Sequence, residues 1–132
     1  MEDCIFCKIA KGEIPSYKVY EDENFFAFLD INPKNKGHTL VIPKQHYRWI
    51  WDIPNIDECY KVVGKVANAI RKSMRTEWVV SLVIGEDVSH AHVWLIPRFE
   101  NDGHGGFIDI SKVIKIPEKE MKEIANKIKE NI

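Results

Sequence analysis

The sequence predicts an α+β fold in which an antiparallel sheet carries one long helix on one face. Short β-prone runs follow one another across short turns, which is typical of antiparallel strand pairs. One longer stretch, from about residue 55 to residue 75, has apolar residues at three- and four-residue steps, as in an amphipathic helix. Helices and strands are therefore expected in the order αβββαββ, with a further helix at the C-terminus.

The first elements are a short helix and a hairpin. Apolar residues recur at helical spacing from Ile5 to Ala10, until Gly12 interrupts the pattern. Residues 17–20 and 25–29 are β-prone runs, and the polar segment EDEN between them is a suitable hairpin connection. We expect these two runs to pair as antiparallel strands.

The third strand and the long helix come next. The segment DINPKNKG, residues 30–37, reads as a loop because of its Asp, Asn, Pro and Gly content. Residues 38–42 are expected to form the third strand, which Pro43 ends. The long helix then follows and is expected to pack over one face of the sheet.

Two further strands and a final helix complete the predicted order. Residues 78–84 and 90–96 are β-rich and are separated by a turn that contains Gly85, so these strands are expected to pair. From Pro117 to Ile132 the chain has a proline at the first turn, acidic residues after it and apolar residues on one face. This pattern predicts a C-terminal helix that packs on the domain or at a dimer edge.

Composition limits the function classes. A chain of 132 residues with 45% hydrophobic residues suits one compact domain. Its net charge is −1, from 19 basic and 20 acidic residues, so polymeric nucleic acid and anionic membrane surfaces are not expected partners. No apolar run is long enough to span a bilayer, and the first residues lack the plan of a signal peptide, so we expect a cytoplasmic protein.

A histidine pair stands at the start of the last predicted strand, in the segment SHAHVWLIPR. Because side chains alternate across a strand, His90, His92 and Trp94 should share one face, and the apolar residues between them should face the long helix. A single histidine there would usually be structural. Two at this spacing favour a functional site, since imidazole acts as nucleophile, proton carrier or metal ligand near neutral pH.

A cysteine pair, Cys4-x-x-Cys7, lies near the N-terminus. Its spacing allows two thiolates to bind one zinc ion, and His46, just after the third strand, is a suitable further ligand. Two alternatives remain at this point: a redox pair, which would require a βαβ context that is missing, or two buried cysteines with no chemical role. An odd total of three cysteines does not predict a disulfide framework.

Three motifs together carry a family resemblance: CIFCKIAKGEIP, FLDINPKNKGHTLVIPKQH and HAHVWLIPR. In order and spacing they resemble the histidine-triad (HIT) family of nucleotide-binding hydrolases and transferases, over about residues 4–98. The resemblance implies a HIT-like five-stranded fold for residues 1–100, with residues 101–132 as a C-terminal extension of the same unit. It also implies a homodimer, because members usually dimerise through their long helices and final strands.

The resemblance implies roles for particular residues. The middle triad histidine of the family attacks the α-phosphorus of a nucleotide, and here that residue is His92. His38 is similar to the family's upstream active-site histidine, and Asp30 to the carboxylate that accepts hydrogen bonds from ribose hydroxyls. The walls of the base and ribose pocket would be Phe6, Ile9, Phe28, Ile31 and Leu40. Without the resemblance, these apolar residues would read as core and Asp30 as a turn residue.

Members with the cysteine pair resemble this chain in a zinc site completed by two histidines. The implied ligands are Cys4, Cys7, His46 and His90. Four protein ligands fill a tetrahedral ion completely, so such a zinc would be structural. It would fix the N-terminal helix and His90 while leaving His92 free to react.

The chain departs from the family at three places. Trp94 occupies the third triad position, and an indole cannot shuttle a proton, so weakened hydrolysis is expected. The turn Gly85–Ser89 reads GEDVS, and its two carboxylates would oppose a bound phosphate unless they point to solvent. The segment NDGHGG, with His104, has no triad counterpart and is expected to be a flexible loop.

Three function hypotheses result. The first is a hydrolase or nucleotidyltransferase that acts at the α-phosphate of a purine nucleotide conjugate: a phosphoramidate, an adenylated small molecule or a dinucleoside polyphosphate. The second is a nucleotide-binding or sensing module whose chemistry is weakened by Trp94 and the acidic turn. The third is a zinc-stabilised interaction scaffold, which the exposed-looking Trp49 and Trp51 and the C-terminal helix would favour.

Overall fold

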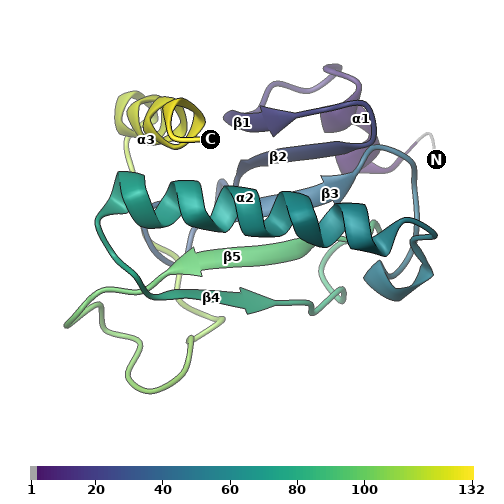
Figure 1. Cartoon of the computed structure of the whole chain (residues 1–132). Helices are drawn as coiled ribbons and strands as arrows, with labels where there is room; N and C mark the ends of the chain where they lie inside the picture. Colours follow the sequence, from purple (N-terminus) through teal and green to yellow (C-terminus); the bar gives the residue numbers. More distant parts are fainter. Residues whose placement is uncertain (1–2) are drawn as a thin grey trace.

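The computed structural model describes residues 3–132 and shows one five-stranded antiparallel sheet with helices on both faces (Figure 1). The strands lie in the order β1-β2-β3-β5-β4, and every neighbouring pair is antiparallel. The α+β prediction is therefore confirmed. The elements in chain order are α1 Ile5–Ala10, β1 Lys18–Glu21, β2 Phe25–Leu29, β3 Thr39–Pro43, a 3-10 turn Ile50–Asp52, α2 Ile56–Met74, β4 Val79–Leu82, β5 Val93–Pro97 and α3 Glu118–Glu130.

The long helix α2 crosses one face of the sheet, and α3 lies beside it next to β1 (Figure 1). The apolar stripe of α2 packs on the side chains of the central strands that face it. This packing is the physical basis of the three- and four-residue spacing in the sequence. The helix ends at Arg75, whose left-handed conformation (φ 56°) lets Thr76 N–H reach the Arg71 carbonyl. The predicted helix over residues 55–75 is thus confirmed.

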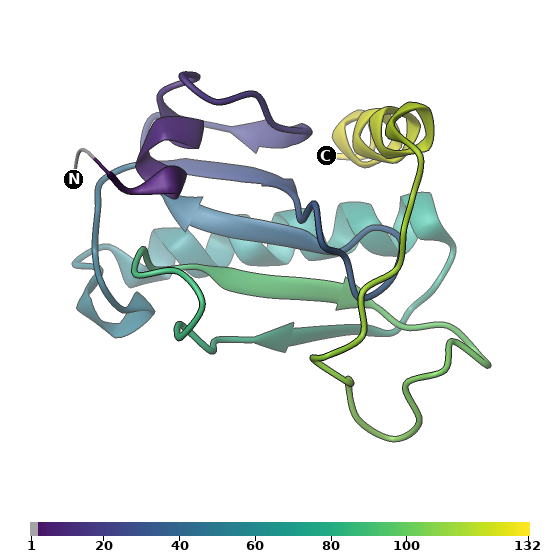
Figure 2. The same cartoon turned by 180° about the vertical axis from the view of Figure 1, so that it is seen from behind.

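The opposite face of the sheet carries α1 and the segment that returns to α3 (Figure 2). Because both faces are covered, β2, β3 and β5 are buried at every residue. The sheet therefore separates two buried clusters. One lies between the sheet and helices α2 and α3, and the other lies under α1 and contains Trp94.

The C-terminal helix α3 forms as predicted. Pro117 stands at its N-terminus, and the apolar side of the helix packs on α2 and β1. The buried residues of that side are Met121, Ile124, Ala125 and Ile128. Within the described part of the chain, α3 thus belongs to the core that α2 makes with the sheet.

Strand β5 begins later than predicted, after the histidine pair. The expected strand over residues 90–96 begins only at Val93, so His90 and His92 lie in the approach to the strand. The reason is local. Ala91 N–H donates to the Tyr47 carbonyl, and the His92 side chain donates to the His90 carbonyl. These two backbone groups are therefore not available for hydrogen bonds to a neighbouring strand. The predicted alternation still holds, because Ala91, Val93 and Leu95 pack in the helix-side cluster.

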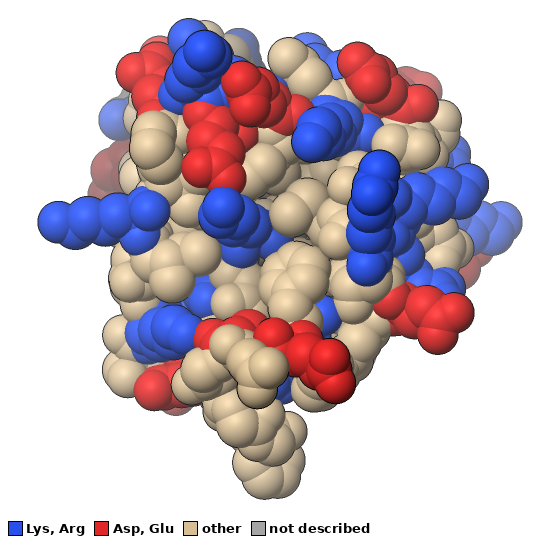
Figure 3. Space-filling model, turned by 90° about the vertical axis from the view of Figure 1, so that its left-hand side faces the viewer, with Lys and Arg blue, Asp and Glu red and all other residues tan. Residues whose placement is uncertain are grey.

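The surface shows basic and acidic side chains intermixed, as Figure 3 shows for one side of the molecule. This distribution accompanies the net charge of −1. Across residues 3–132, no helix combines the length and the apolar composition that crossing a bilayer requires.

Candidate active site and metal centre

A cluster of four metal-ligand side chains lies at the edge of the face that α1 covers. Cys4 caps α1, with its Sγ accepting the Cys7 N–H, and one helical turn brings Cys7 to the same side. His46 follows β3, and His90 precedes β5, which pairs with β3. The sheet therefore brings together residues that are up to 86 positions apart in sequence.

The distances in this cluster fit a tetrahedral zinc ion. His90 Nδ1 lies 3.4 Å from both Cys4 Sγ and Cys7 Sγ, and His46 Nδ1 lies 3.5 Å from Cys7 Sγ. All four ligand atoms lie within 4.8 Å of one another. A zinc tetrahedron with the usual Zn–S and Zn–N bonds has S···N edges of about 3.6 Å. The described residues therefore form a Cys₂His₂ set that suits zinc.

A hydrogen bond to the backbone determines which ring nitrogen of His90 faces the thiols. His90 Nε2 donates to the Pro43 carbonyl at 2.8 Å, so Nδ1 presents its lone pair to the cysteines. Burial lowers the pKa of His90 to about 4, which keeps the ring neutral as a ligand must be. Burial and the neighbouring Cys4 raise the pKa of the Cys7 thiol, so a cation is needed to hold both sulfurs as thiolates.

His92 is held in an orientation that suits a nucleophile. Its ring is buried, and Nδ1 donates to the His90 carbonyl at 2.8 Å, which leaves the lone pair of the neutral ring on Nε2. Nε2 has no hydrogen-bond partner among the described residues. The edge of Phe6 packs against the ring, with 5.2 Å between the centroids.

Asp87 faces this nitrogen from the turn before β5. Its Oδ1 lies 3.2 Å from His92 Nε2, and its side chain is 51% exposed. The expected opposition between the acidic turn and a phosphate thus applies to Asp87, because a phosphate that reaches Nε2 must displace this carboxylate. The turn is held by Gly85, whose φ is +80° and whose missing side chain leaves room for the Trp49 ring, 2.6 Å from where a Cβ would lie.

His38 is buried and presents the opposite tautomer. Its Nδ1 accepts the backbone N–H of Lys34 at 3.1 Å, so the proton of the neutral ring is on Nε2. Burial, with smaller contributions from Lys34 and His92, lowers the pKa of His38 to about 3. Its Nε2 lies 3.6 Å from Asp30 Oδ2 and has no hydrogen-bond partner in the described chain. Burial also raises the pKa of Asp30. The hydrogen bond that Asp30 Oδ1 accepts from the Asn32 N–H opposes this increase.

Trp94 fills the third triad position as a buried side chain. The indole is 6% exposed, and its ring meets the His38 ring edge to face with 4.9 Å between the centroids. Its Nε1–H, like His38 Nε2, lacks a hydrogen-bond partner over residues 3–132. The position therefore provides one fixed donor and no proton carrier.

The apolar residues expected around a nucleotide do not all lie together. Four of them belong to the buried cluster under α1, and Phe6 packs edge to face on Phe28 with 5.5 Å between the centroids. These four residues are Phe6, Ile9, Phe28 and Leu40. Ile31 stands apart, because it is 72% exposed and lines a groove of about 800 Å³ with Tyr17 and Ala125 of α3.

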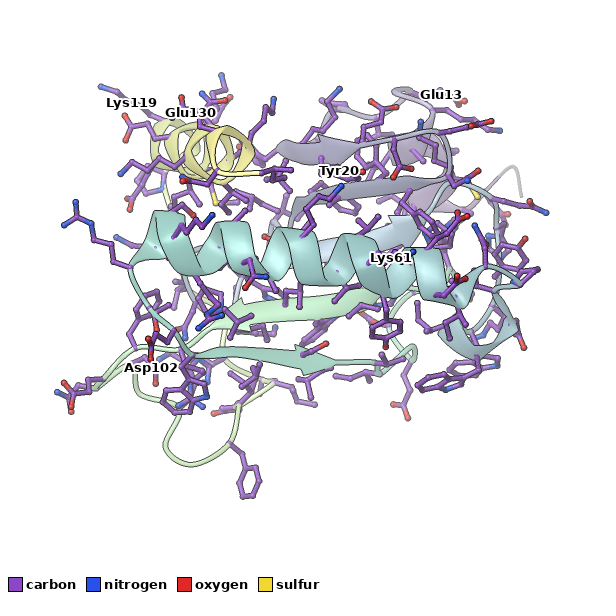
Figure 4. All side chains as sticks on the ribbon, viewed as in Figure 1. Glu13, Tyr20, Lys61, Asp102, Lys119 and Glu130 are labelled. Atoms are coloured by element: carbon purple, nitrogen blue, oxygen red, sulfur yellow. The ribbon has the colours of Figure 1, made fainter. Side chains whose placement is uncertain are left out.

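The C-terminal extension supports the site in a way that the sequence did not predict. Asp102, labelled in Figure 4, accepts a bidentate pair from the buried Arg98 guanidinium at 2.7 and 3.1 Å. It also accepts from Asn35 in the loop before His38, at 3.0 Å. The Arg98 guanidinium, with further hydrogen bonds, holds the pKa of Asp102 well below its usual range. The loop before β3 is thereby tied to the segment after β5.

His104 was expected in a flexible loop, and the structure instead anchors it. The ring is buried, with Nε2 donating to the Lys34 carbonyl at 2.8 Å and Nδ1 accepting the Asp109 N–H at 3.0 Å. The glycines around His104 had suggested mobility, but its own two ring nitrogens fix the segment. Lys34, which His104 holds, is itself buried, and a lone lysine in a polar loop carries no sequence signal of burial.

Comparison with known proteins identifies relatives. A family model, the HIT domain, matches residues 11–101. An uncharacterized HIT-like protein of Methanocaldococcus jannaschii is 41% identical, over 96% of this chain and 98% of its own. The adenosine 5'-monophosphoramidase HNT1 of Saccharomyces cerevisiae is 41% identical, over 72% of this chain and 62% of its own. The adenylylsulfatase HINT3 of Arabidopsis thaliana is 38% identical, over 76% and 54%.

Solved structures agree with this relationship. A HIT-like protein from Bartonella henselae superimposes with a TM-score of 0.86 at 34% identity, covering 100% of this chain and 98% of its own. A zinc-bound histidine triad family protein from Mycobacterium smegmatis gives a TM-score of 0.79 at 29% identity, covering 98% and 93%. Because the family model matches more than two thirds of the chain and the likeness in sequence and fold extends over nearly all of it, this chain belongs to the HIT domain family.

Proposed function

We propose that the protein is a nucleotide hydrolase or nucleotidyltransferase that acts at the α-phosphate of a purine nucleotide conjugate through a covalent nucleotidyl-histidine on His92. The observation that carries this proposal is the orientation of His92, whose Nδ1–H bond to the His90 carbonyl directs Nε2 into the site, where the exposed Asp87 carboxylate lies 3.2 Å away. Family membership supports it, and so do the two relatives whose names refer to adenylyl compounds. Candidate substrates are phosphoramidates, adenylated small molecules and dinucleoside polyphosphates.

The proposed reaction has two steps. His92 Nε2 forms a bond to the α-phosphorus while the bond to the leaving group breaks and its electron pair departs with that group. In the second step, a water oxygen bonds to phosphorus, the P–N electron pair returns to Nε2, and one water proton passes to solvent. The Nδ1 proton stays on the ring throughout, held by the His90 carbonyl. His38, neutral and protonated on Nε2, provides a fixed donor near the reacting group.

We assign the remaining site residues by the same proposal. Phe6, Ile9, Phe28 and Leu40 would bind the base and ribose from the cluster under α1, and Ile31 would contact them from its exposed position outside that cluster. Asp30 would accept hydrogen bonds from ribose hydroxyls. Residues 1–100 would contain this site, while residues 101–132 hold the loop before His38 in place.

We propose zinc as the structural ion bound by Cys4, Cys7, His46 and His90. The distances within the set and the zinc-bound relative support this assignment. Four protein ligands leave no open position, so a bound ion supplies rigidity and no acid or base chemistry. The ligands themselves connect α1 to the approach of β5, and therefore fix the backbone from which His92 projects.

The test of the proposal follows product release and intact mass together. The protein is incubated with adenosine phosphoramidate and with a fluorogenic adenylated amine. We expect AMP release with a transient mass increase, and we expect both signals to disappear in His92→Ala. The surface variant Trp51→Ala, at a side chain that is 68% exposed, serves as the matched control and should keep wild-type rates. Unchanged turnover in His92→Ala contradicts the proposal.

A second function is favoured by two observations at the same site. Trp94 cannot carry a proton, and Asp87 stands 3.2 Å from the nucleophilic nitrogen, where it opposes a phosphate. A nucleotide-binding or sensing module with weakened chemistry would show micromolar nucleotide binding without product release or adduct. The scaffold hypothesis, which the exposed Trp49 and Trp51 support, would show no nucleotide binding at all.

We also propose a cytoplasmic homodimer. The sheet ends in β4, whose outer edge is unpaired in the described chain, and Trp78 beside it is exposed. A second copy could extend the sheet at this edge. Light scattering on the purified protein tests the proposal, since a monomeric mass at micromolar concentration would contradict it.

A further inference from the structure

Two buried N–H donors without hydrogen-bond partners and one lysine ammonium lie together near the proposed nucleophile. They belong to Lys34, His38 and Trp94, which are 7%, 1% and 6% exposed. His38 Nε2 and Trp94 Nε1 are buried with no partner in the described chain. Buried donors are usually satisfied, so these two unsatisfied N–H groups indicate an acceptor that the protein itself does not provide.

These donors contact one another. The Lys34 Nζ lies over the Trp94 ring, 5.6 Å from its centroid, and the His38 ring packs against the same indole. The Lys34 backbone N–H also donates a hydrogen bond to His38 Nδ1, so the proton of the neutral His38 ring is on Nε2. Loop residues 34–38 thus place a cation and an imidazole donor against one indole.

Lys34 is buried without an acidic partner. Among residues 3–132, no carboxylate oxygen lies within the 4.0 Å that defines an ion pair with its ammonium, whereas the exposed Lys36, two residues later, pairs with Glu120 at 2.6 Å. A mostly buried lysine side chain without an acidic partner is costly to hold in place, and its ammonium is available to an anion. The anchoring of the Lys34 carbonyl by His104 keeps this residue in place despite that cost.

The surrounding charges explain what the ammonium does. Asp30 lies 3.6 Å from His38 Nε2, and Asp87 lies 3.2 Å from His92 Nε2. A phosphoryl group in this region would meet these two carboxylates, and the Lys34 ammonium offsets their charge. Trp94 cannot supply a positive charge in the third triad position, whereas a lysine ammonium supplies one together with three donors.

We propose that the Lys34 ammonium, with the N–H groups of His38 and Trp94, forms a subsite for a phosphoryl oxyanion of the bound nucleotide. The subsite provides the positive charge that Trp94 cannot carry. It rests on the proposed function for the nucleotide itself. The phosphoryl group can be the α-phosphate or the next group along the chain, and the experiment separates these two sources.

The test measures equilibrium binding by calorimetry, which requires no turnover. The probes are adenosine, AMP and α,β-methylene-ADP. Lys34→Met keeps the length of the side chain and removes its charge, and Lys36→Met is the matched control at an exposed lysine of the same loop. Lys34→Arg retains the positive charge and shows whether another cationic side chain at this position supports binding of the phosphorylated probes. Thermal melting of each variant confirms that it is folded.

We expect Lys34→Met to weaken the binding of α,β-methylene-ADP, or of both AMP and α,β-methylene-ADP, about 10- to 100-fold, the effect of losing one charge-assisted hydrogen bond, and to leave adenosine binding unchanged. An equal loss for AMP and α,β-methylene-ADP supports the α-phosphate as the occupant. A loss confined to α,β-methylene-ADP supports the next phosphoryl group. Lys36→Met should match the wild type for all three probes.

Two results with the variant, and two with the wild type, would overturn the proposal. In the first, Lys34→Met binds the phosphorylated probes as the wild type does. In the second, adenosine binding falls as much as AMP binding, which shows a general disturbance of the pocket. A wild-type chain that binds adenosine but gains nothing from a phosphate refutes the subsite alone. A wild-type chain that binds none of the three probes contradicts the proposed function as well.

Discussion

The buried, neutral His38 predicts how the stability of the protein depends on pH. Burial lowers the pKa of His38 to about 3, from 6.5 in an exposed chain. Between these two values the unfolded chain binds a proton that the folded chain does not. Stability from this group is therefore present above pH 6.5 and is lost as the pH falls toward 3.

The magnitude follows from the two pKa values. At pH 5 the unfolded imidazole is protonated by about 30 to 1 while the folded one stays neutral, so the free energy of unfolding falls by RT ln 33, about 2 kcal/mol. Replacement of His38 by asparagine removes the titrating group and keeps an oxygen that can accept the Lys34 N–H.

The assay is urea unfolding at pH 7.5 and pH 5.0, with the wild type and His38→Asn in the same zinc-containing buffer. The wild type should lose about 2 kcal/mol more than the variant between the two pH values. Other titrating groups, including the proposed zinc ligands, are common to both proteins and cancel in this difference. The reasoning is refuted if both proteins lose the same free energy on acidification.

Three further predictions concern other parts of the site. Cys7→Ser should lower bound zinc from one ion per chain to well below that and lower the melting temperature, as metal analysis and calorimetry would show; full zinc occupancy would contradict the assigned ligands. Asp87→Asn should tighten AMP binding about two- to fivefold because it removes an exposed charge facing the phosphate, and weaker binding would show that Asp87 assists the ligand instead. Asp102→Ala should lower the free energy of unfolding by about 3–5 kcal/mol, because it leaves the buried Arg98 guanidinium without its partner, and a loss below 1 kcal/mol in urea unfolding would contradict this account.

The sequence by itself determined the fold class, the element order and the family. Period-2 and period-3.6 patterns report directly which residues face a core, and the motifs kept their spacing. The sequence likewise points to four candidate zinc ligands, because cysteine and histidine bind zinc strongly and the family resemblance implies these positions. The structure then brought Cys4, Cys7, His46 and His90 within ligand distance of one another.

Local hydrogen bonds modified some of these expectations. Strand β5 begins at Val93, later than predicted, because the His92 side chain bonds the His90 backbone. The loop around His104 is held, although its glycines suggested mobility, because its imidazole bonds the chain on both sides. Such competition depends on which partner lies within reach, and a pattern of residue types does not encode it.

Only the tertiary structure decided the tautomers and charges of the site. The tautomers of His38 and His92 depend on backbone groups that the fold places beside their Nδ1 atoms. The burial of Lys34 over Trp94 depends on contacts between the loop before β3, the sheet and the segment after β5. Spacing along the chain determines which side chains share a face, whereas packing in three dimensions determines which polar atoms find partners and which are left to bind a ligand.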